Sequence, residues 1–298
     1  MKVSKQAHLA IFLANLIYGA NFSIARFAMP EYLSPSGFIM LRVAFATVLF
    51  ILLDRISPSI RPLEKKDVFR FILLGLFGVA INQLLFFEGL NRTTNINAAL
   101  IMTSTPVLVT AMAFLLLKDR LTTLQSIGIL LGLSGAITLI LQYENVSGSA
   151  SGIGDLMVFL NAASYALFMV LAKPMMKKYG TIQVIKWAFV FGTIFVIPFG
   201  APDLIGVQWS EFPASAWFAV IFVLVFTTFG AYLLNTFGLK YLSPSVVSYY
   251  IYLQPLFATL ISGFMTHEMV TPVQVMACIL IFTGVYLVNR RILVKTES

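Results

Sequence analysis

The sequence predicts an all-α integral membrane protein with ten transmembrane helices, arranged as two inverted repeats of five helices each. Three observations lead to this fold class. The chain of 298 residues is 59% hydrophobic and only 11% charged, whereas an ordinary soluble domain is about 45–50% apolar and about 25% charged. Long apolar runs follow one another with short connections, and a segment of the first half is similar to a segment of the second half.

Ten segments are long and apolar enough to cross a bilayer, since a transmembrane helix needs about 20 mostly apolar residues. The longest connections predicted between them are 54–68, 143–152 and 200–213, which leaves no room for a soluble domain. The first run follows Lys2 and Lys5 and is too long for a cleavable signal peptide, so we interpret it as a span. The ten predicted spans are 8–27, 36–53, 69–90, 96–117, 123–142, 153–173, 181–199, 214–237, 244–265 and 271–289.

The Lys and Arg residues divide unequally between the two sides of the predicted bundle. Only Arg26 and Arg92 fall on one side, and Arg42 and Lys186 lie within spans. The positive-inside rule therefore predicts that both termini are cytoplasmic. This placement also explains the net charge of +8 without a nucleic-acid partner. The cations on the predicted cytoplasmic side are Lys2, Lys5, Arg55, Arg61, Lys65, Lys66, Arg70, Lys118, Arg120, Lys173, Lys177, Lys178, Lys240, Arg290, Arg291 and Lys295.

The sequence lacks the residues that several classes of function require. The single cysteine, Cys278, excludes a disulfide framework, and His8 and His267 are too far apart for a zinc motif, so we expect no metal and no cofactor. The sequence contains no GxxxxGK[ST] loop, which argues against ATP drive in this chain. A membrane-embedded enzyme is an alternative from a different class. It would need a nucleophile–base pair or paired acids at one depth, which the predicted spans do not offer.

The two halves of the chain repeat each other. The segment "GLNRTTNINAALIMTSTPVLVT" (89–110) aligns with "GLKYLSPSVVSYYIYLQPLFAT" (238–259) at an offset of 149. We therefore predict one five-helix repeat in 1–145 and a second in 146–298. Because five is an odd number, the second repeat runs through the membrane in the opposite sense, an architecture typical of alternating access. The aligned identities are Gly89 with Gly238, Leu90 with Leu239, Pro106 with Pro255, and Thr110 with Thr259.

Polar side chains recur near the middle of several predicted spans in both halves. Unsatisfied polar groups are costly in lipid, so such residues tend to face protein or a water-filled cavity. We predict that they line a central cavity that binds a solute, although small polar side chains also act as interhelical glue. The predicted substrate-binding residues are Asn15, Tyr18, Asn82, Gln83, Ser104, Tyr165, Tyr232, Asn235, Tyr249, Tyr250 and Gln254.

Two prolines within the spans are candidates for helix kinks at the level of the cavity. Pro106 and Pro255 are repeat mates that we expect to kink their helices and to free the carbonyls four residues earlier, on Met102 and Ile251. A kink can also serve packing alone.

Glu88, Arg42 and Lys186 are charged residues within the spans, and the first two have two interpretations each. Glu88 is a possible proton-coupling site or a partner of Arg92 one turn away. Arg42 is a possible contact for a carboxylate or phosphate, or it snorkels to a helix end. Lys186 is expected to snorkel to the cytoplasm.

Two long segments carry a family resemblance. They are "GLNRTTNINAALIMTSTPVLVTAMAFLLLKDRLT" (89–122) and "GLKYLSPSVVSYYIYLQPLFATLISGFMTHEMVT" (238–271). Each has a small residue plus leucine, a polar turn, a helix with a central proline, an acid and a following helix that contains glycine. In these features the chain resembles the drug/metabolite transporter superfamily, in particular EamA-type permeases.

The resemblance implies a bundle in which the first, third, fourth, sixth, eighth and ninth helices line a central cavity, with the fifth and tenth at the periphery. It implies that Pro106 and Pro255 are kinks at the level of the cavity and that Asp119 and Glu268 are acids of the family pattern. It also implies transport of small organic solutes, often export of amino acids from the bacterial inner membrane.

The sequence thus predicts a secondary transporter that exports small organic metabolites, with amino acids as the expected substrates, and that works by alternating access. The alternative is a nucleotide-sugar or phosphorylated-metabolite carrier, which would need two cations at the cavity, where only Arg42 and Lys186 are candidates. The expected partners are a small-molecule substrate and the lipid bilayer, with protons as a candidate coupling ion.

Gly128 and Gly132 form a GxxxG pattern, which favours close helix packing or dimerisation. Both a monomer and a homodimer are compatible with it.

Overall fold

The fold is helical throughout the part of the chain that the structure, a computed structural model, describes. Eight helical segments are long and apolar enough to cross a membrane, and two shorter apolar helices, Tyr250–Met265 and Pro272–Leu287, bring the number to the ten that the sequence predicts. The predicted fold class is confirmed. The described residues are 2–56, 62–117, 122–142, 150–241, 250–265 and 270–296.

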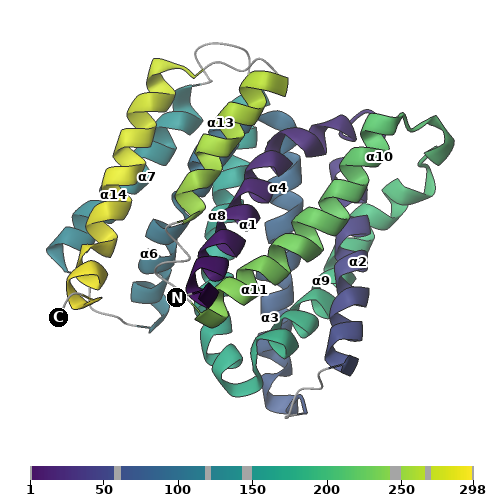
Figure 1. Cartoon of the computed structure of the whole chain (residues 1–298), viewed down its shortest axis with the longest axis horizontal. Coiled ribbons are helices and arrows are strands. Elements are labelled where there is room, and N and C mark those ends of the chain that lie inside the picture. The colour runs from purple at the N-terminus through teal and green to yellow at the C-terminus, as the bar shows by residue number, and fades with distance from the viewer. Residues whose placement is uncertain are drawn as a thin grey trace.

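The α-helices carry the labels of Figure 1. Two π-helical segments, η3 (Leu76–Ala80) and η6 (Phe222–Gly230), lie inside the third and the eighth span, and η7 (Tyr250–Tyr252) is a short 3₁₀ helix. The α-helices are α1 (Lys2–Ile24), α2 (Pro35–Ile56), α3 (Val68–Gly75), α4 (Ile81–Arg92), α5 (Asn95–Met102), α6 (Thr105–Leu117), α7 (Thr123–Gln142), α8 (Ala150–Tyr179), α9 (Thr181–Ile205), α10 (Ala214–Ile221), α11 (Ala231–Tyr241), α13 (Leu253–Met265) and α14 (Pro272–Thr296).

Two helices extend beyond their predicted ends. α8 continues past 173 through Pro174, and α9 continues past 199 through Pro202. Both helices are longer than the predicted spans, because the prediction followed only the apolar run of about 20 residues that crosses a bilayer. Within a bundle a helix tolerates proline when neighbouring groups satisfy the freed backbone atoms. The predicted connection over 200–213 is correspondingly shorter in the structure.

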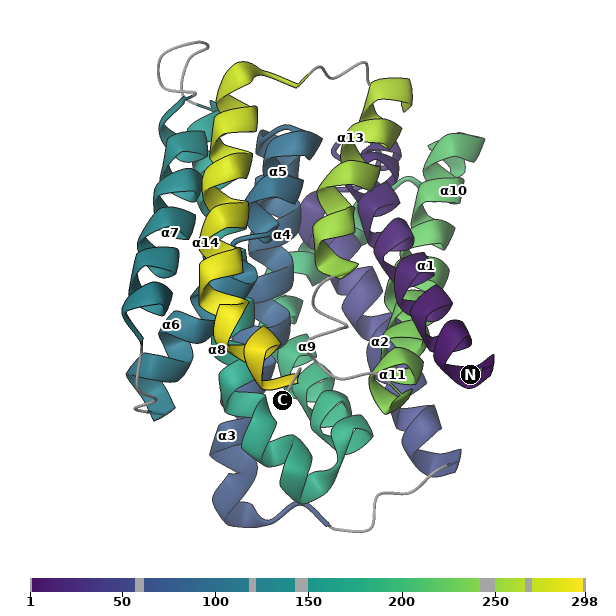
Figure 2. The same cartoon turned by 60° about the vertical axis from the view of Figure 1, so that its left-hand side comes forward.

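The helix packing follows a pseudo-two-fold axis that relates the two halves. α2 packs on α9, and α7 packs on α14, so each of these helices meets its own repeat mate. α4 packs on α8, and the equivalent pair is α11 with α1. α6 also packs on α8, and its equivalent is α13 on α1. The views in Figures 1 and 2 agree with this pairing, with α7 and α14 side by side at one edge of the bundle.

The glycine pattern of α7 is used inside the chain. A Cβ on Gly284 of α14 would lie 2.5 Å from the carbonyl oxygen of Gly128 and 2.5 Å from the amide nitrogen of Gly132. Only glycine permits so close an approach of the two backbones. The GxxxG face that the sequence offered for packing or dimerisation is therefore occupied by α14.

The two repeats run in opposite senses, as Figure 2 shows: α1 rises from the end of the bundle where α3 begins, whereas α8 descends towards that end. Both termini lie towards it. We call it the inner end, in keeping with the charge pattern, and we call the opposite end the outer end. The predicted division between 145 and 146 falls outside the described residues and stays a prediction.

Candidate functional site

Three hydrogen bonds at mid-depth join α1 to the second half of the chain. Gln254 Nε2 donates to Asn15 Oδ1 at 2.8 Å, and Asn235 Nδ2 donates to the Tyr18 hydroxyl at 3.2 Å. One turn further along α1, the Thr227 hydroxyl donates to the side-chain oxygen of Asn21. The structure thus brings together four of the predicted substrate-binding residues in two pairs, and each pair crosses between the halves.

A second polar contact lies on the equivalent side of the pseudo-two-fold axis, between α4 and α8. Asn161 Nδ2 donates to the backbone carbonyl of Asn82 at 2.6 Å, and Asn82 Nδ2 donates to the carbonyl of Asn161 at 3.3 Å. Both side chains are buried, and Asn161 Oδ1 has no hydrogen-bond partner in the part of the chain that the structure describes. Asn82 was predicted to bind substrate, and in this structure its amide links two helices.

The π-helical segments occupy equivalent places in the two repeats. Adding the offset of 149 to 76–80 gives 225–229, which falls inside η6. In each segment a backbone carbonyl accepts a hydrogen bond from a hydroxyl: Phe77 from Ser164 at 2.6 Å, and Val223 from Thr228 at 2.8 Å. Such wide turns inside helices are frequent at functional sites. No sequence pattern predicted them.

Arg42 of α2 lies beside these elements. Its Nε atom donates to the hydroxyl of Thr228 in η6 at 2.9 Å, and its guanidinium carbon lies 5.7 Å from the centre of the Phe87 ring. Within the described residues no carboxylate forms an ion pair with Arg42.

The helix around Pro106 is broken rather than bent. α5 ends at Met102 and α6 begins at Thr105, and the hydroxyl of Thr105 donates to the carbonyl of Met102 at 2.6 Å. The carbonyl that the proline was expected to free therefore has a protein donor in this structure, and its role towards a ligand stays a prediction. Ser104 is fully buried and donates to the carbonyl of Ile101, so its hydroxyl is used within the same turn.

Pro255 occupies a different setting from its repeat mate. It lies in the first turn of α13, which begins at Leu253, rather than at the centre of a helix. Proline is tolerated there because the amide hydrogens of a first turn have no partner within the helix. Because residues 244–249 of the predicted span lie outside the described residues, the kink expected at Pro255 stays a prediction. Just before α13, the Tyr250 hydroxyl lies 2.8 Å from Nδ1 of His8, a partner that the sequence did not suggest.

The remaining predicted substrate-binding residues are either half-buried or lie partly or wholly outside the described residues. Gln83 and Tyr165 are half-buried, and Tyr165 stacks on Phe168 with 6.0 Å between ring centres. Of Tyr232 only the backbone, in α11, is described, and Tyr249 lies outside the described residues, as do Asp119 and Glu268.

Glu88 forms the ion pair that was one of its two interpretations. Arg92 Nη2 lies 3.1 Å from Glu88 Oε2, one turn along α4 at its outer end, where both side chains are partly exposed. The carboxylate has a surface partner, which removes the reason to assign it to proton coupling.

Asp155, near the start of α8, was missed by sequence reasoning. Its side chain is 0% exposed and accepts hydrogen bonds from the Thr93 hydroxyl and from Asn97 Nδ2, the latter at 3.0 Å. Asn97 Oδ1 in turn accepts from Gln274 Nε2 of α14 at 2.7 Å. A lone acid within a predicted span is the signal that could have pointed to it, since intramembrane acids are rare and usually have a role.

A connected set of bonds continues from this carboxylate across the outer end. The Arg26 guanidinium donates to the carbonyls of Leu90 and Thr93, and Arg26 Nε donates to Asn95 Oδ1 at 2.7 Å. Asn95 Nδ2 donates to the Ser23 hydroxyl at 3.3 Å. The hydroxyls of Ser23 and Ser262 lie 2.9 Å apart. We call the whole set the outer network: Ser23, Arg26, Thr93, Asn95, Asn97, Asp155, Ser262 and Gln274.

The inner end carries ion pairs instead. Lys186 Nζ of α9 lies 2.6 Å from Asp54 Oδ2 of α2. The sequence did not predict this partner of Lys186, and snorkelling of Lys186 towards the cytoplasm stays a prediction. Lys178 Nζ of α8 lies 2.6 Å from Asp67 Oδ2 and 2.7 Å from Glu64 Oε1, and donation from Lys178 and Lys66 lowers the pKa of Glu64.

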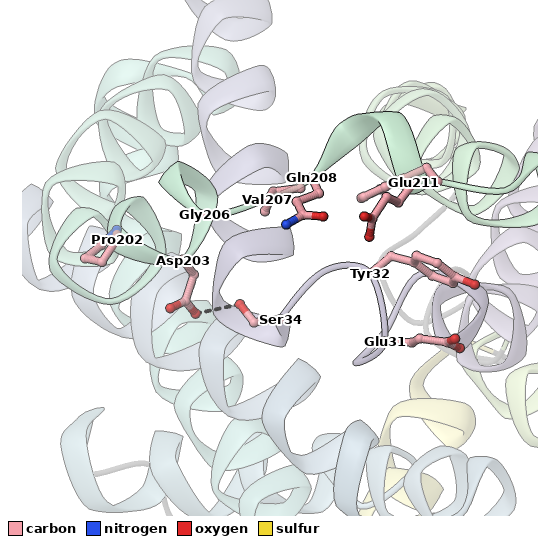
Figure 3. Close-up of a pocket in the computed structure, with 10 residues that line it drawn as sticks. Glu31, Tyr32, Ser34, Pro202, Asp203, Gly206, Val207, Gln208 and Glu211 are labelled. Carbon is pink, nitrogen blue, oxygen red and sulfur yellow. Dashed lines mark hydrogen bonds between the residues drawn. The ribbon is translucent and has the colours of Figure 1, made fainter.

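An acidic pocket opens at the outer end, away from the mid-depth residues (Figure 3). Its volume is about 450 Å³, and its lining comes from the connection between α1 and α2 and from the end of α9 with the residues that follow it. Asp203 on its wall accepts hydrogen bonds from Ser34, at 2.5 Å, and from Ser36. This pocket is not the central cavity that the sequence predicts, because none of the predicted substrate-binding residues lines it. The central cavity stays a prediction.

Comparison with known proteins gives the family. A model described as the EamA-like transporter family matches residues 5–141 and again residues 152–290. The chain belongs to this family. The uncharacterized transporter YyaM of Bacillus subtilis is 28% identical over 285 residues, which cover 93% of each chain. The uncharacterized transporter YetK of the same organism is 26% identical over 277 residues, 89% of this chain and 82% of its own.

A solved crystal structure shares the fold, with a TM-score of 0.60 over 97% of this chain and 99% of the other at 19% identity. The resemblance to EamA-type permeases that the sequence indicated is confirmed. This EamA protein is therefore a multi-pass integral membrane protein of a transporter family, with a small-molecule substrate.

Proposed function

We propose that this EamA transporter exports amino acids or closely related metabolites from the cytoplasm, by alternating access at a site formed by the mid-depth residues. In this proposal it lies in a bacterial inner membrane with both termini cytoplasmic. The orientation is supported by the distribution of Lys and Arg, of which only Arg26 and Arg92 fall on the outer side.

The observation that carries the proposal is the set of mid-depth contacts between the halves. Tyr18 with Asn235, and Asn15 with Gln254, pair phenol and amide groups from α1, α11 and α13. Each group can exchange its protein partner for a solute with donors and acceptors, and the aromatic rings offer an apolar face. Two inverted repeats that meet at such a site can expose it to either side in turn.

The test is counterflow in proteoliposomes. Vesicles containing purified protein are loaded with a panel of unlabelled amino acids, and uptake of trace labelled threonine, methionine and phenylalanine is followed with and without a pH gradient. We expect uptake that depends on the internal amino acid. Gln254→Ala and Asn235→Ala should reduce the exchange rate by about tenfold, the effect of about 1.4 kcal/mol in hydrogen bonding.

The matched control is Ser134→Ala, because Ser134 is an exposed residue of α7 that bonds within its own helix. This variant should exchange solute at the wild-type rate. Exchange at the wild-type rate in both Gln254→Ala and Asn235→Ala would refute the site, and no exchange with any amino acid would refute the substrate class.

The phosphorylated-metabolite carrier has less support than it had from the sequence. It needs two cations near the solute, and Lys186 is paired with Asp54. A sugar phosphate and a nucleotide sugar belong in the same counterflow panel, where preferential exchange of either would reverse this ranking.

A further inference from the structure

Two arginines of the first half have very different surroundings. The Arg26 guanidinium, at the outer end, donates to two backbone carbonyls and to a side-chain amide, so it is firmly held by the protein. Arg42 donates only through Nε, to the Thr228 hydroxyl. Within the described residues, its two terminal nitrogens have no acceptor at hydrogen-bond distance. The group that remains available on Arg42 is the planar pair of N–H donors that fits a carboxylate.

Arg42 does not escape to the membrane surface. It follows the start of α2 by seven residues, which places its Cα about 10 Å below the outer end at 1.5 Å per residue. Its side chain reaches Thr228, in the middle of the span formed by α10, η6 and α11, and lies against Phe87. Snorkelling, the alternative interpretation of this residue, would instead point the guanidinium towards water.

Among the described residues, the acids within or near the spans are engaged elsewhere. Asp54 pairs with Lys186, Glu88 pairs with Arg92, and Asp155 is bonded to Thr93 and Asn97. The remaining described acids lie at the two ends of the bundle: Glu31, Glu64, Asp67, Asp203 and Glu211. An unneutralised charge within a span is costly and is usually retained for a function.

We propose that Arg42 binds the carboxylate of the transported solute, so that the substrates are amino acids or other monocarboxylates. A single unpaired cation matches one negative charge, and its forked donors match the two oxygens of a carboxylate. Thr228, which bonds to Arg42, follows Thr227, which bonds to Asn21 on α1. Tyr18, one turn from Asn21 and bonded to Asn235, then meets the rest of the solute. The aromatic face of Phe87 and the Thr228 hydroxyl hold the guanidinium in place. This inference rests on the proposed function and names its substrate class.

The test compares an amino acid with its own carboxamide, which lacks the charge and one acceptor oxygen. Counterflow is measured for L-phenylalanine and L-phenylalaninamide, or for the corresponding pair of whichever amino acid exchanges fastest, in wild-type protein, R42Q and R42K. We expect wild-type protein to prefer the free amino acid by about tenfold or more, since a charged hydrogen bond contributes about 1.5–3 kcal/mol. R42Q should bring this ratio to about two, and R42K should lie between, because it keeps the charge and loses the fork.

The matched control is R70Q, the same substitution at an exposed residue near the inner end, which should keep the wild-type ratio. A purely structural role for Arg42 would lower both rates and leave their ratio unchanged, which would overturn the inference. Equal exchange of the acid and the amide by wild-type protein would also overturn it, and this measurement needs no variant to fold. If wild-type protein exchanges no amino acid at all, it is the proposed function that fails.

Discussion

The two ends of the bundle are joined by different kinds of bond. At the outer end, an unbroken series of hydrogen bonds runs from Ser262 on α13 to Gln274 on α14, and all of its bonds are buried except the part-buried ones of Arg26. The residues between are Ser23, Asn95, Arg26, Thr93, Asp155 and Asn97. At the inner end, the ion pairs of Lys186 and Lys178 join neighbouring helices, α9 to α2 and α8 to the start of the third span. Lys186, Asp54 and Lys178 have partly exposed side chains, whereas Asp67 is buried.

The difference indicates which end is closed. The outer network connects five α-helices from both repeats, whereas the ion pairs of Lys186 and Lys178, which also cross between the repeats, each join only two segments. Buried polar groups that satisfy one another fix a single arrangement, because removing one leaves its partners unsatisfied. We interpret this structure as the state closed at its outer end, and we expect export to require that the outer network opens.

The largest effect on stability should come from Asn97, which both donates to Asp155 and accepts from Gln274. Asn97→Ala leaves a buried carboxylate with one donor fewer and a buried amide without its acceptor. We expect a loss of about 2–3 kcal/mol in the free energy of unfolding, measured by reversible denaturation in mixed micelles. The control is Asn91→Ala on α4, a half-buried residue near the same end. Equal losses in the two variants would show that the outer network does not hold this end together.

A smaller effect should follow from breaking the inner pair. Asp54→Asn leaves Lys186 without its counter-ion, and since both side chains are partly exposed, at 15% and 19%, water can solvate the charge that remains. We expect a loss of about 1 kcal/mol, between the values for exposed and buried pairs. A double-mutant cycle with Lys186→Met measures the coupling. If Asp54→Asn lowered the free energy of unfolding more than Asn97→Ala does, the inner end and not the outer end would be the more strongly held.

The smallest effect concerns acid stability at the inner end. Donation from Lys178 and Lys66 lowers the pKa of Glu64 in the folded protein. The resulting stabilisation is therefore present at pH values above the carboxyl's ordinary pKa and is lost as the pH falls through the lowered value. Because Glu64 is well exposed, the contribution should be slight. Glu64→Gln should flatten the acid limb of the melting temperature against pH, and an unchanged limb would show that the contact is not formed in solution.

The sequence predicted the features that depend on the length of apolar runs and on the repeat between the two halves. Apolar run lengths located ten spans, and the offset between Pro106 and Pro255 revealed the repeat. It could not predict partners. Asn82 and Gln254 are both mid-span amides, yet one bonds to the backbone of α8 and the other to Asn15, because the choice depends on how two helices are rotated against each other.

The missed features have the same origin. The π-helical turns of η3 and η6 arise from packing and have no residue signature, and His8 meets Tyr250 only because α1 lies against η7. The repeat mates Pro106 and Pro255 differ in setting although the sequence presents them as equivalent. Asp155 was visible in the sequence as a lone acid, but its burial depends on α4, α5 and α14 meeting above it.

The most direct test of the central claim is a pair of distances between spin labels, measured in wild-type protein and in Asn97→Ala. On a Cys278→Ala background, exposed positions provide an outer pair, Ile153 with Phe264, and an inner pair, Phe69 with Tyr241. If the outer network holds the outer end closed, Asn97→Ala should add a longer component to the outer distance and a shorter one to the inner distance. Distributions that stay unchanged, or that lengthen at both ends together, would contradict the account.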